Sequence, residues 1–147
     1  LEPTRSLVLT DLDPSQSYRV SVRARNERGT SAWSKAVSVT PLDLPPSVTI
    51  QAPSEGASVR GKVRVTVTPS LAKGSGAELR WVEACIATPE WLLACSHVNA
   101  WGHTSGKKLE LDVDLPEEAS GPATLQVEVG DSAGRVATAS RSLTIAP

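Results

Sequence analysis

The two cysteines, Cys85 and Cys95, are the residues whose types and spacing most directly suggest chemistry. Each lies in a run in which every second residue is apolar and should face a core. Those apolar residues are Val82, Ala84, Ile86, Leu92 and Ala94. Alternate side chains of a strand point to opposite faces, so both cysteines should face outward. A hairpin that turns near residues 88–91 would place them opposite each other, within bridging distance.

We therefore predict a disulfide between Cys85 and Cys95, with two unlinked thiols as the alternative. Closing so short a loop stabilises a fold by roughly 2–3 kcal/mol in the chain-entropy model. Such a bond indicates an oxidising compartment. His97 and His103 follow, but the pattern Cys-x9-Cys-x-His-x5-His lacks the closely spaced ligand pairs of zinc sites. We expect no metal ion and no cofactor.

Three acidic residues, Glu110, Asp112 and Asp114, alternate with apolar residues and should share one face of a strand. Carboxylates are calcium ligands. However, alternate positions on a strand lie about 7 Å apart, too far for three of them to converge on one ion. A neighbouring strand should present Lys62 and Arg64 on the same face. We therefore expect cross-strand ion pairs, each worth a few tenths of a kcal/mol.

Three tryptophans, Trp81, Trp91 and Trp101, fall within one short stretch that is rich in polar residues. Exposed aromatic rings with polar neighbours can stack on sugar rings or form protein-binding hot spots. The candidate binding surface consists of Trp91, His97, Asn99, Trp101 and His103. The alternative is a structural role, because the chain contains no Phe and tryptophan is then the only large filler for a core. We expect two of the three to be structural.

The sequence contains no catalytic motif: there is no Gly-x-Ser-x-Gly elbow, no phosphate loop and no His-Glu-x-x-His helix. A disulfide would also leave no free thiol nucleophile, so we expect no enzyme activity. The net charge of −1 argues against nucleic-acid binding, which needs concentrated basic charge. No apolar run approaches the roughly 18 residues of a membrane span, so no membrane insertion of this segment is expected.

The elements that must position these residues are short strands. Alternating runs rich in Val, Thr and Ser, separated by turns with Gly and Pro, predict an all-β protein. The run 17–26 alternates strictly, and after a turn at 27–30 a second run follows at 36–40. Leu7-Val8-Leu9 should form an earlier strand. Trp33 should pack against the arginine-bearing run.

The clearest motif of this first part reads Leu12-x-Pro14-x-x-x-Tyr18-x-Val20-x-Val22-x-Ala24-x-Asn26-x-x-Gly29-x-Ser31, followed by Ser34 and Thr40-Pro41. It resembles the last third of a fibronectin type III domain. The resemblance implies that residues 1–42 are strands E, F and G, and that the hydroxyl of the corner tyrosine bonds to the backbone upstream. Strands A to D are missing. A longer chain should supply them, or alternatively a neighbouring copy covers the open apolar face.

A linker at residues 43–47 contains Pro45-Pro46, which favours an extended and fairly stiff hinge. Residues 48–147 are expected to form a second antiparallel β-sandwich. Its expected strands are 48–52, 62–68, 78–87, 91–98, 109–115, 124–129 and 136–145. The chain therefore reads as two tandem β-sandwiches, of which the first is incomplete.

The second part carries the loose motifs Pro53-x-x-Gly56, Val59-x-Gly61 and Val82-x-Ala84-x-Ile86, then Trp91-x-x-Ala94 and Gly121-x-x-x-Leu125-x-Val127-x-Val129-x-Asp131-x-Ala133-Gly134-Arg135. In this order they resemble bacterial immunoglobulin-like repeats. The resemblance implies a surface stalk, an adhesin or an accessory module of a secreted enzyme. It also implies a secreted or cell-surface location.

These observations favour a non-catalytic structural or interaction segment of a bacterial extracellular protein. Two alternatives remain open: a self-assembling subunit of a surface filament or sheath, and a glycan-binding accessory module of a secreted hydrolase. The expected partners are other domains of the same longer chain or neighbouring copies, and a polysaccharide in the glycan-binding case.

Overall fold

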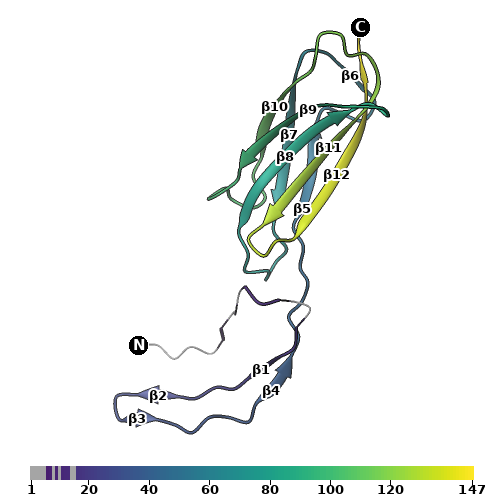
Figure 1. Cartoon of the computed structure of the whole chain (residues 1–147). Coiled ribbons are helices and arrows are strands. Elements are labelled where there is room, and N and C mark those ends of the chain that lie inside the picture. Colours follow the sequence, from purple (N-terminus) through teal and green to yellow (C-terminus); the bar gives the residue numbers. More distant parts are fainter. Residues whose placement is uncertain (1–5, 8, 10, 14–15) are drawn as a thin grey trace.

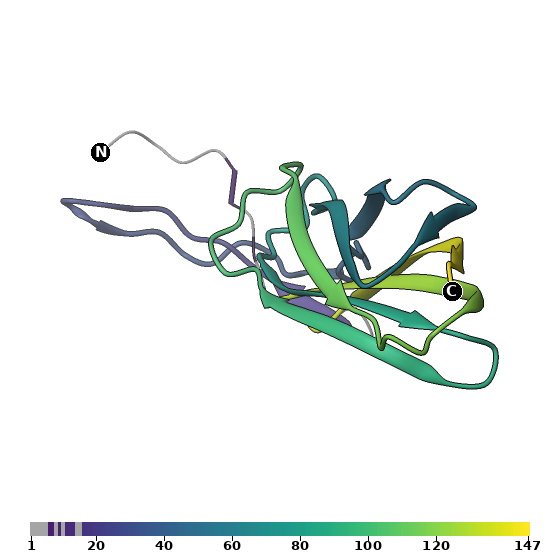
Figure 2. The same cartoon turned by 90° about the horizontal axis from the view of Figure 1, so that it is seen from above.

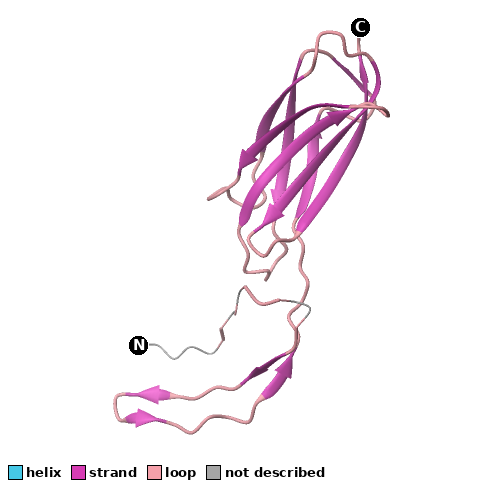
Figure 3. Ribbon diagram, in the orientation of Figure 1, coloured by secondary structure: helices cyan, strands magenta, loops and turns pink. Residues whose placement is uncertain are grey.

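The computed structural model describes residues 6, 7, 9, 11–13 and 16–147, and this part of the chain is all-β (Figures 1 and 3). None of these residues belongs to a helix, so the described chain has no helix that could cross a membrane. The strands gather into a sandwich built from the second part of the chain and a long hairpin built from the first. The all-β prediction is confirmed.

The sandwich consists of two sheets that pack face to face (Figure 2). The smaller sheet has the order β10 (Leu109–Asp114), β7 (Lys62–Ser70) and β5 (Ser47–Ala52). The larger sheet has the order β6 (Ala57–Val59), β12 (Val136–Ile145), β11 (Gly121–Asp131), β8 (Leu79–Ala87) and β9 (Leu92–Asn99). All neighbours are antiparallel except β6 and β12, which run parallel. This arrangement is that of an immunoglobulin-like sandwich.

The core lies between the sheets and is filled by the alternating apolar residues of each strand. Its completely buried side chains include Val65, Val67, Val82, Ile86, Val113, Leu125, Val127 and Val129. None of the tryptophans is among the buried core residues, and Trp91 and Trp101 are exposed. The core therefore uses no tryptophan as a large filler, and any structural role of the tryptophans lies outside it. Branched aliphatic side chains fill the space between two flat sheets without a large ring.

At the start of strand β9, the inward or outward direction of the side chains differs from the prediction. Ile86 pairs with Ala94, but Ala87 pairs with Leu92, so Leu93 is an extra residue in a β-bulge. The bulge turns Leu93 toward the core and leaves Leu92 exposed at 67%. The expectation that Leu92 faces inward is wrong for this reason. Strand β6 was also not expected, because three residues are too short for a periodicity to show.

The first part of the chain folds into one hairpin that extends away from the sandwich (Figure 1). Its strands are β1 (Tyr18–Val20), β2 (Arg25–Asn26), β3 (Gly29–Thr30) and β4 (Val37–Val39), with β1 paired to β4 and β2 to β3. The expected continuous strand 17–26 is interrupted between these pairs. Leu7 and Leu9 are not in a strand, and Val8 lies outside the described residues.

Two serines bridge the interruption in the hairpin. The N–H of Val22 donates to Ser34 Oγ at 2.9 Å, and the N–H of Ala24 donates to Ser31 Oγ at 2.9 Å. Ser34 and Ser31 return backbone hydrogen bonds to the carbonyls of Val22 and Ala24. Side-chain oxygens thus stand in for the carbonyls of a regular ladder, and the hairpin stays closed.

The corner tyrosine is where the resemblance placed it. Tyr18 Oη accepts a hydrogen bond from the backbone N–H of Asp13 at 3.1 Å, which fastens the strand to the chain before it. Further along the hairpin, the guanidinium of Arg23 lies 4.5 Å from the ring centroid of Trp33, as expected for Trp33 against the arginine-bearing strand. Along the same hairpin, Val22 and Val37 are more than half exposed, which leaves an open apolar face.

The assignment of which side chains of the large sheet face the core can be tested with two leucines, one buried and one exposed. We expect Leu125→Ala, at a completely buried position, to lower the free energy of unfolding by about 3–5 kcal/mol. The control Leu92→Ala, at the exposed bulge, should change it by less than about 0.5 kcal/mol. Urea unfolding followed by tryptophan fluorescence measures both values. Equal losses would show that the assigned bulge is wrong.

Candidate functional site

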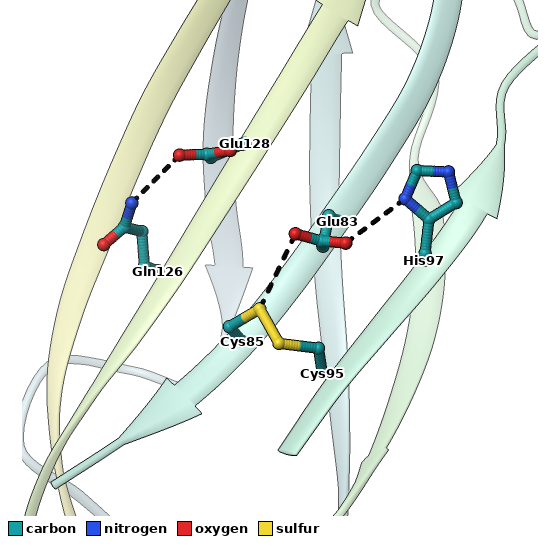
Figure 4. The surroundings of a disulfide bond; sticks show 6 residues. All are labelled: Glu83, Cys85, Cys95, His97, Gln126 and Glu128. Atoms are coloured by element: carbon teal, nitrogen blue, oxygen red, sulfur yellow. Dashed lines mark hydrogen bonds and ion pairs between the residues drawn. A yellow bond between two sulfur atoms is a disulfide. The ribbon is translucent and has the colours of Figure 1, made fainter. Parts of the chain in front are cut away.

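The disulfide lies on the outer face of the large sheet, at the centre of the candidate site (Figure 4). Cys85 on β8 and Cys95 on β9 are direct cross-strand partners, and their sulfurs are bonded at 2.03 Å. Their Cα atoms are 4.1 Å apart, the close spacing of a non-hydrogen-bonded antiparallel pair. The pairing predicted from the alternation of β8 is therefore present, and the described chain has no free cysteine.

The next outward pair along the same two strands is Glu83 and His97. His97 Nδ1 lies 3.3 Å from Glu83 Oε2, within reach of an ion pair when the imidazole is protonated. The other carboxylate oxygen, Oε1, lies 3.8 Å from Cys85 Sγ. A disulfide sulfur carries no proton, so this second approach is a contact and not a hydrogen bond. A carboxylate, an imidazole and two sulfurs thus meet in one square of the sheet.

Trp81 extends the same face beyond His97. The two rings stack with centroids 5.8 Å apart and planes 25° from parallel. The indole lies directly over Gly130 of β11, and a Cβ atom at Gly130 would come within 2.3 Å of the ring. Gly130 is therefore needed because a flat ring occupies the position where its side chain would be. Sequence reasoning missed this contact, which only the pairing of Trp81 with Gly130 reveals.

The neighbouring strand β11 adds an amide and a second carboxylate to this face. Glu128 is the register partner of Glu83, and Gln126 is the partner of Cys85. Gln126 Nε2 donates to Glu128 Oε1 at 3.1 Å (Figure 4). Two carboxylates at adjoining positions, Glu83 and Glu128, give this face an acidic character. The signal in the sequence is that Glu83 and Glu128 each stand between two apolar residues of a strand.

The structure does not gather the predicted binding surface into one patch. Trp91 precedes β9 and Trp101 follows it, so the eight residues of that strand lie between them, or about 25 Å. His97 lies midway, in the square with Glu83. A polysaccharide would therefore find no continuous aromatic platform from one tryptophan to the other.

At the far end of β9, the other members of the predicted surface hold one another in place. Asn99 Oδ1 accepts the backbone N–H of Trp101 at 2.9 Å, and the guanidinium of Arg80 lies 3.5 Å from the centroid of that indole. His103 Nε2 lies 2.8 Å from the carbonyl of Lys107. These contacts order the loop after β9 and engage Oδ1 of Asn99 and Nε2 of His103.

The acidic face of the small sheet forms the expected ion pairs. Arg64 on β7 contacts Asp112 at 3.0 Å and Glu110 at 3.8 Å, and Lys62 is the register partner of Asp114. The hydrogen bond from Arg64 holds the pKa of the Asp112 carboxyl below its usual value. These side chains are well exposed, so the pairs contribute little to stability.

The contact between Trp81 and Gly130 can be tested with a double-mutant cycle. Gly130→Ala should destabilise the sandwich by about 1–3 kcal/mol, because the new methyl group must displace the indole. In a Trp81→Ala background the same substitution should cost much less. Urea unfolding of the four proteins measures the coupling. A cost that is the same in both backgrounds would contradict the packing described here.

Removal of the disulfide should weaken the sandwich without unfolding it. In the chain-entropy model, Cys85→Ala with Cys95→Ala lowers the free energy of unfolding by roughly 2–3 kcal/mol. The ladders between β8 and its two neighbours do not depend on the sulfurs, so circular dichroism should stay that of a β-protein. Urea unfolding gives the difference, and no change in stability would argue that the bond does not form.

Comparison with known proteins assigns the hairpin. Residues 1–40 match the sequence model of the fibronectin type III domain. No curated protein matches the chain. Among solved structures, an endo-beta-1,4-mannanase from Thermotoga petrophila aligns with 12% identity over 69% of this chain and 20% of its own, with a TM-score of 0.48.

Two further structures are similar at this level. CopC from Methylosinus trichosporium OB3b aligns with 18% identity over 69% of this chain and 94% of its own, with a TM-score of 0.46. The fibronectin(III)-like modules of Clostridium thermocellum CbhA align with 16% identity over 88% and 61%, with a TM-score of 0.45. The match of the sequence model and the hydrogen bond of the corner tyrosine both relate the first part of the chain to the fibronectin type III domain.

Proposed function

We propose that this chain is a non-catalytic spacer segment of an extracellular protein, which holds the modules on either side of it in a fixed relative direction. The observation that carries this proposal is the junction between the hairpin and the sandwich. A flexible tether would leave all of its residues in solvent, whereas here Pro46 is buried, Leu44 is half-buried and Asp43 reaches Arg135 at the end of the large sheet. The predicted disulfide pair supports an oxidising location.

The junction is built around Arg135 in the turn between β11 and β12. Its Nε donates to Asp131 Oδ2 at 3.0 Å, and Asp131 Oδ1 accepts the backbone N–H groups of Ala133 and Arg135. Asp131 is the buried charged residue of the described chain, so the turn is held from inside. The side chain of Arg135 is only 15% exposed, and its position is therefore fixed before it meets the linker.

The linker contributes a carboxylate and two apolar side chains to the junction. Asp43 Oδ1 lies 4.0 Å from Arg135 Nη1, Leu44 is half-buried and Pro46 is buried. The ion pair is exposed on the Asp43 side and contributes little by itself. Burial of Leu44 and Pro46, with the restricted backbone of Pro45-Pro46, supplies most of the stiffness. Between the two parts a hollow of about 310 Å³ is lined by Leu12, Pro41 and Ala133, among others.

The proposal can be tested by measuring whether the two parts move together in the whole chain. Residual dipolar couplings of residues 16–40 and 47–147 should fit one alignment tensor, because the junction fixes their relative orientation. Arg135→Ala removes both the turn's internal ion pair and the contact with Asp43, so the fit to one tensor should worsen. The matched control is Arg60→Ala, an exposed arginine away from the junction, which should leave the single fit intact.

Two independent tensors in the unaltered protein would overturn the spacer proposal, since a flexible junction cannot fix a direction. An Arg135→Ala protein that keeps the single tensor would instead show that the hydrophobic part of the junction suffices. That result would show that Arg135 is not needed to fix the junction, while the spacer function would stay supported.

A further inference from the structure

We propose that reduction of the Cys85–Cys95 disulfide converts the outer face of β8 and β9 into a binding site for a zinc-class divalent cation. The ligands are the two thiolates, Nδ1 of His97 and one carboxylate oxygen of Glu83. The site is independent of the spacer function, because it lies on the sheet face and not at the junction. It uses the two neighbouring register pairs Glu83–His97 and Cys85–Cys95 of this sheet face.

Three of the four ligands already lie close together, and His97 lies beside one of them. The sulfurs of Cys85 and Cys95 and a carboxylate oxygen of Glu83 all lie within 4.8 Å of one another, and His97 Nδ1 is 3.3 Å from the same carboxylate group. Zinc binds sulfur at about 2.3 Å and nitrogen or oxygen at about 2.0–2.2 Å, so tetrahedral ligands lie roughly 3.3–3.8 Å apart. The 3.3 Å from Glu83 Oε2 to His97 Nδ1 and the 3.8 Å from Glu83 Oε1 to Cys85 Sγ fall in this range. They involve different oxygens, so the Glu83 carboxylate must rotate to present one oxygen to the ion.

The strand pairing explains why these ligands can close around one ion although the sequence spacing resembles no zinc motif. Glu83 and Cys85 are alternate residues of β8, and Cys95 and His97 are alternate residues of β9. Pairing of Glu83 with His97 and of Cys85 with Cys95 makes four adjacent corners of one sheet face. Three carboxylates along a single strand, such as Glu110, Asp112 and Asp114, lack this cross-strand closure.

The redox step balances with an added dithiol as the reductant. The dithiol gives two electrons and two protons to the Cys85–Cys95 bond, which breaks to two thiols, while the reductant closes to its own cyclic disulfide. Cys95 is exposed, so a reductant can reach the bond. The cation then displaces the two thiol protons to solvent, and the freed sulfurs separate by side-chain rotation to occupy two corners of the tetrahedron.

The surroundings favour a cation and orient its ligands. Glu128 lies beside Glu83 in the ladder and adds negative charge next to the square. The indole of Trp81 stacks on His97 and is itself seated on Gly130, so the imidazole has a packed neighbour that limits its rotation. A bound ion would join β8 to β9 at the place where the disulfide joins them in the oxidised protein.

The test uses the whole chain, reduced with a dithiol that is then removed without oxygen, and Co²⁺ as the spectroscopic probe. We expect a thiolate-to-cobalt charge-transfer band in the near ultraviolet, visible bands of tetrahedral Co²⁺, and displacement of both by Zn²⁺. The oxidised protein should show neither. Glu83→Gln and His97→Ala should each weaken binding by roughly tenfold or more.

The matched controls are Glu110→Gln and His103→Ala, the same changes on other surfaces, which should leave the titration unchanged. Circular dichroism of the reduced protein without metal checks that the sheet persists. Three results would each overturn the proposal: no charge-transfer band, unfolding on reduction alone, or Glu83→Gln and His97→Ala proteins that bind Co²⁺ as tightly as the unaltered chain. The last result would mean that the two thiolates bind the ion without the rest of the square.

Discussion

The register of β8 against its two neighbours is the constraint on which the rest of this molecule depends. Val82, Ala84 and Ile86 are completely buried, and they can be so only if the residues between them face away from the core. A shift by one residue would bury Glu83 and Cys85 and expose three apolar side chains. The hydrophobic effect thus fixes the outer face as firmly as it fixes the core, and the disulfide joins partners that the register has already brought together.

The same register organises two features with different consequences. On the outer face it creates the square of Glu83, Cys85, Cys95 and His97, and it seats Trp81 on Gly130. Strand β11 ends at the turn in which Asp131 binds Arg135. Arg135 in turn contacts Asp43 of the linker. A sandwich with an ordinary aliphatic core therefore presents one face on which a disulfide, a carboxylate and an imidazole are neighbours, and one end that contacts the linker to the hairpin.

Much of this could be predicted from the sequence, wherever strict alternation marks a half-buried strand. The outward direction of Cys85 follows from the three buried neighbours of β8, and the ion pairs of Arg64 follow from the same reasoning on β7 and β10. Tyr18 could be placed because its motif is long. Leu92 could not, because the bulge at Leu93 leaves no trace in the pattern of apolar residues. The packing of Trp81 on Gly130 could not be predicted either, since it depends on which residue of a distant strand is the register partner of Trp81.

The register of β8 against β9 is tested most directly by cross-strand contacts between backbone protons in solution. Cys85 and Cys95 form a close pair with Cα atoms 4.1 Å apart, so their Hα atoms should give a strong nuclear Overhauser effect. Such an effect between the Hα atoms of Cys85 and Cys95, and none between those of Cys85 and Ala94, is the result predicted by the register. A strong nuclear Overhauser effect from Cys85 to Ala94 instead would show that Cys95 is not the register partner of Cys85. The disulfide, the square and the outer face described here would then be wrong.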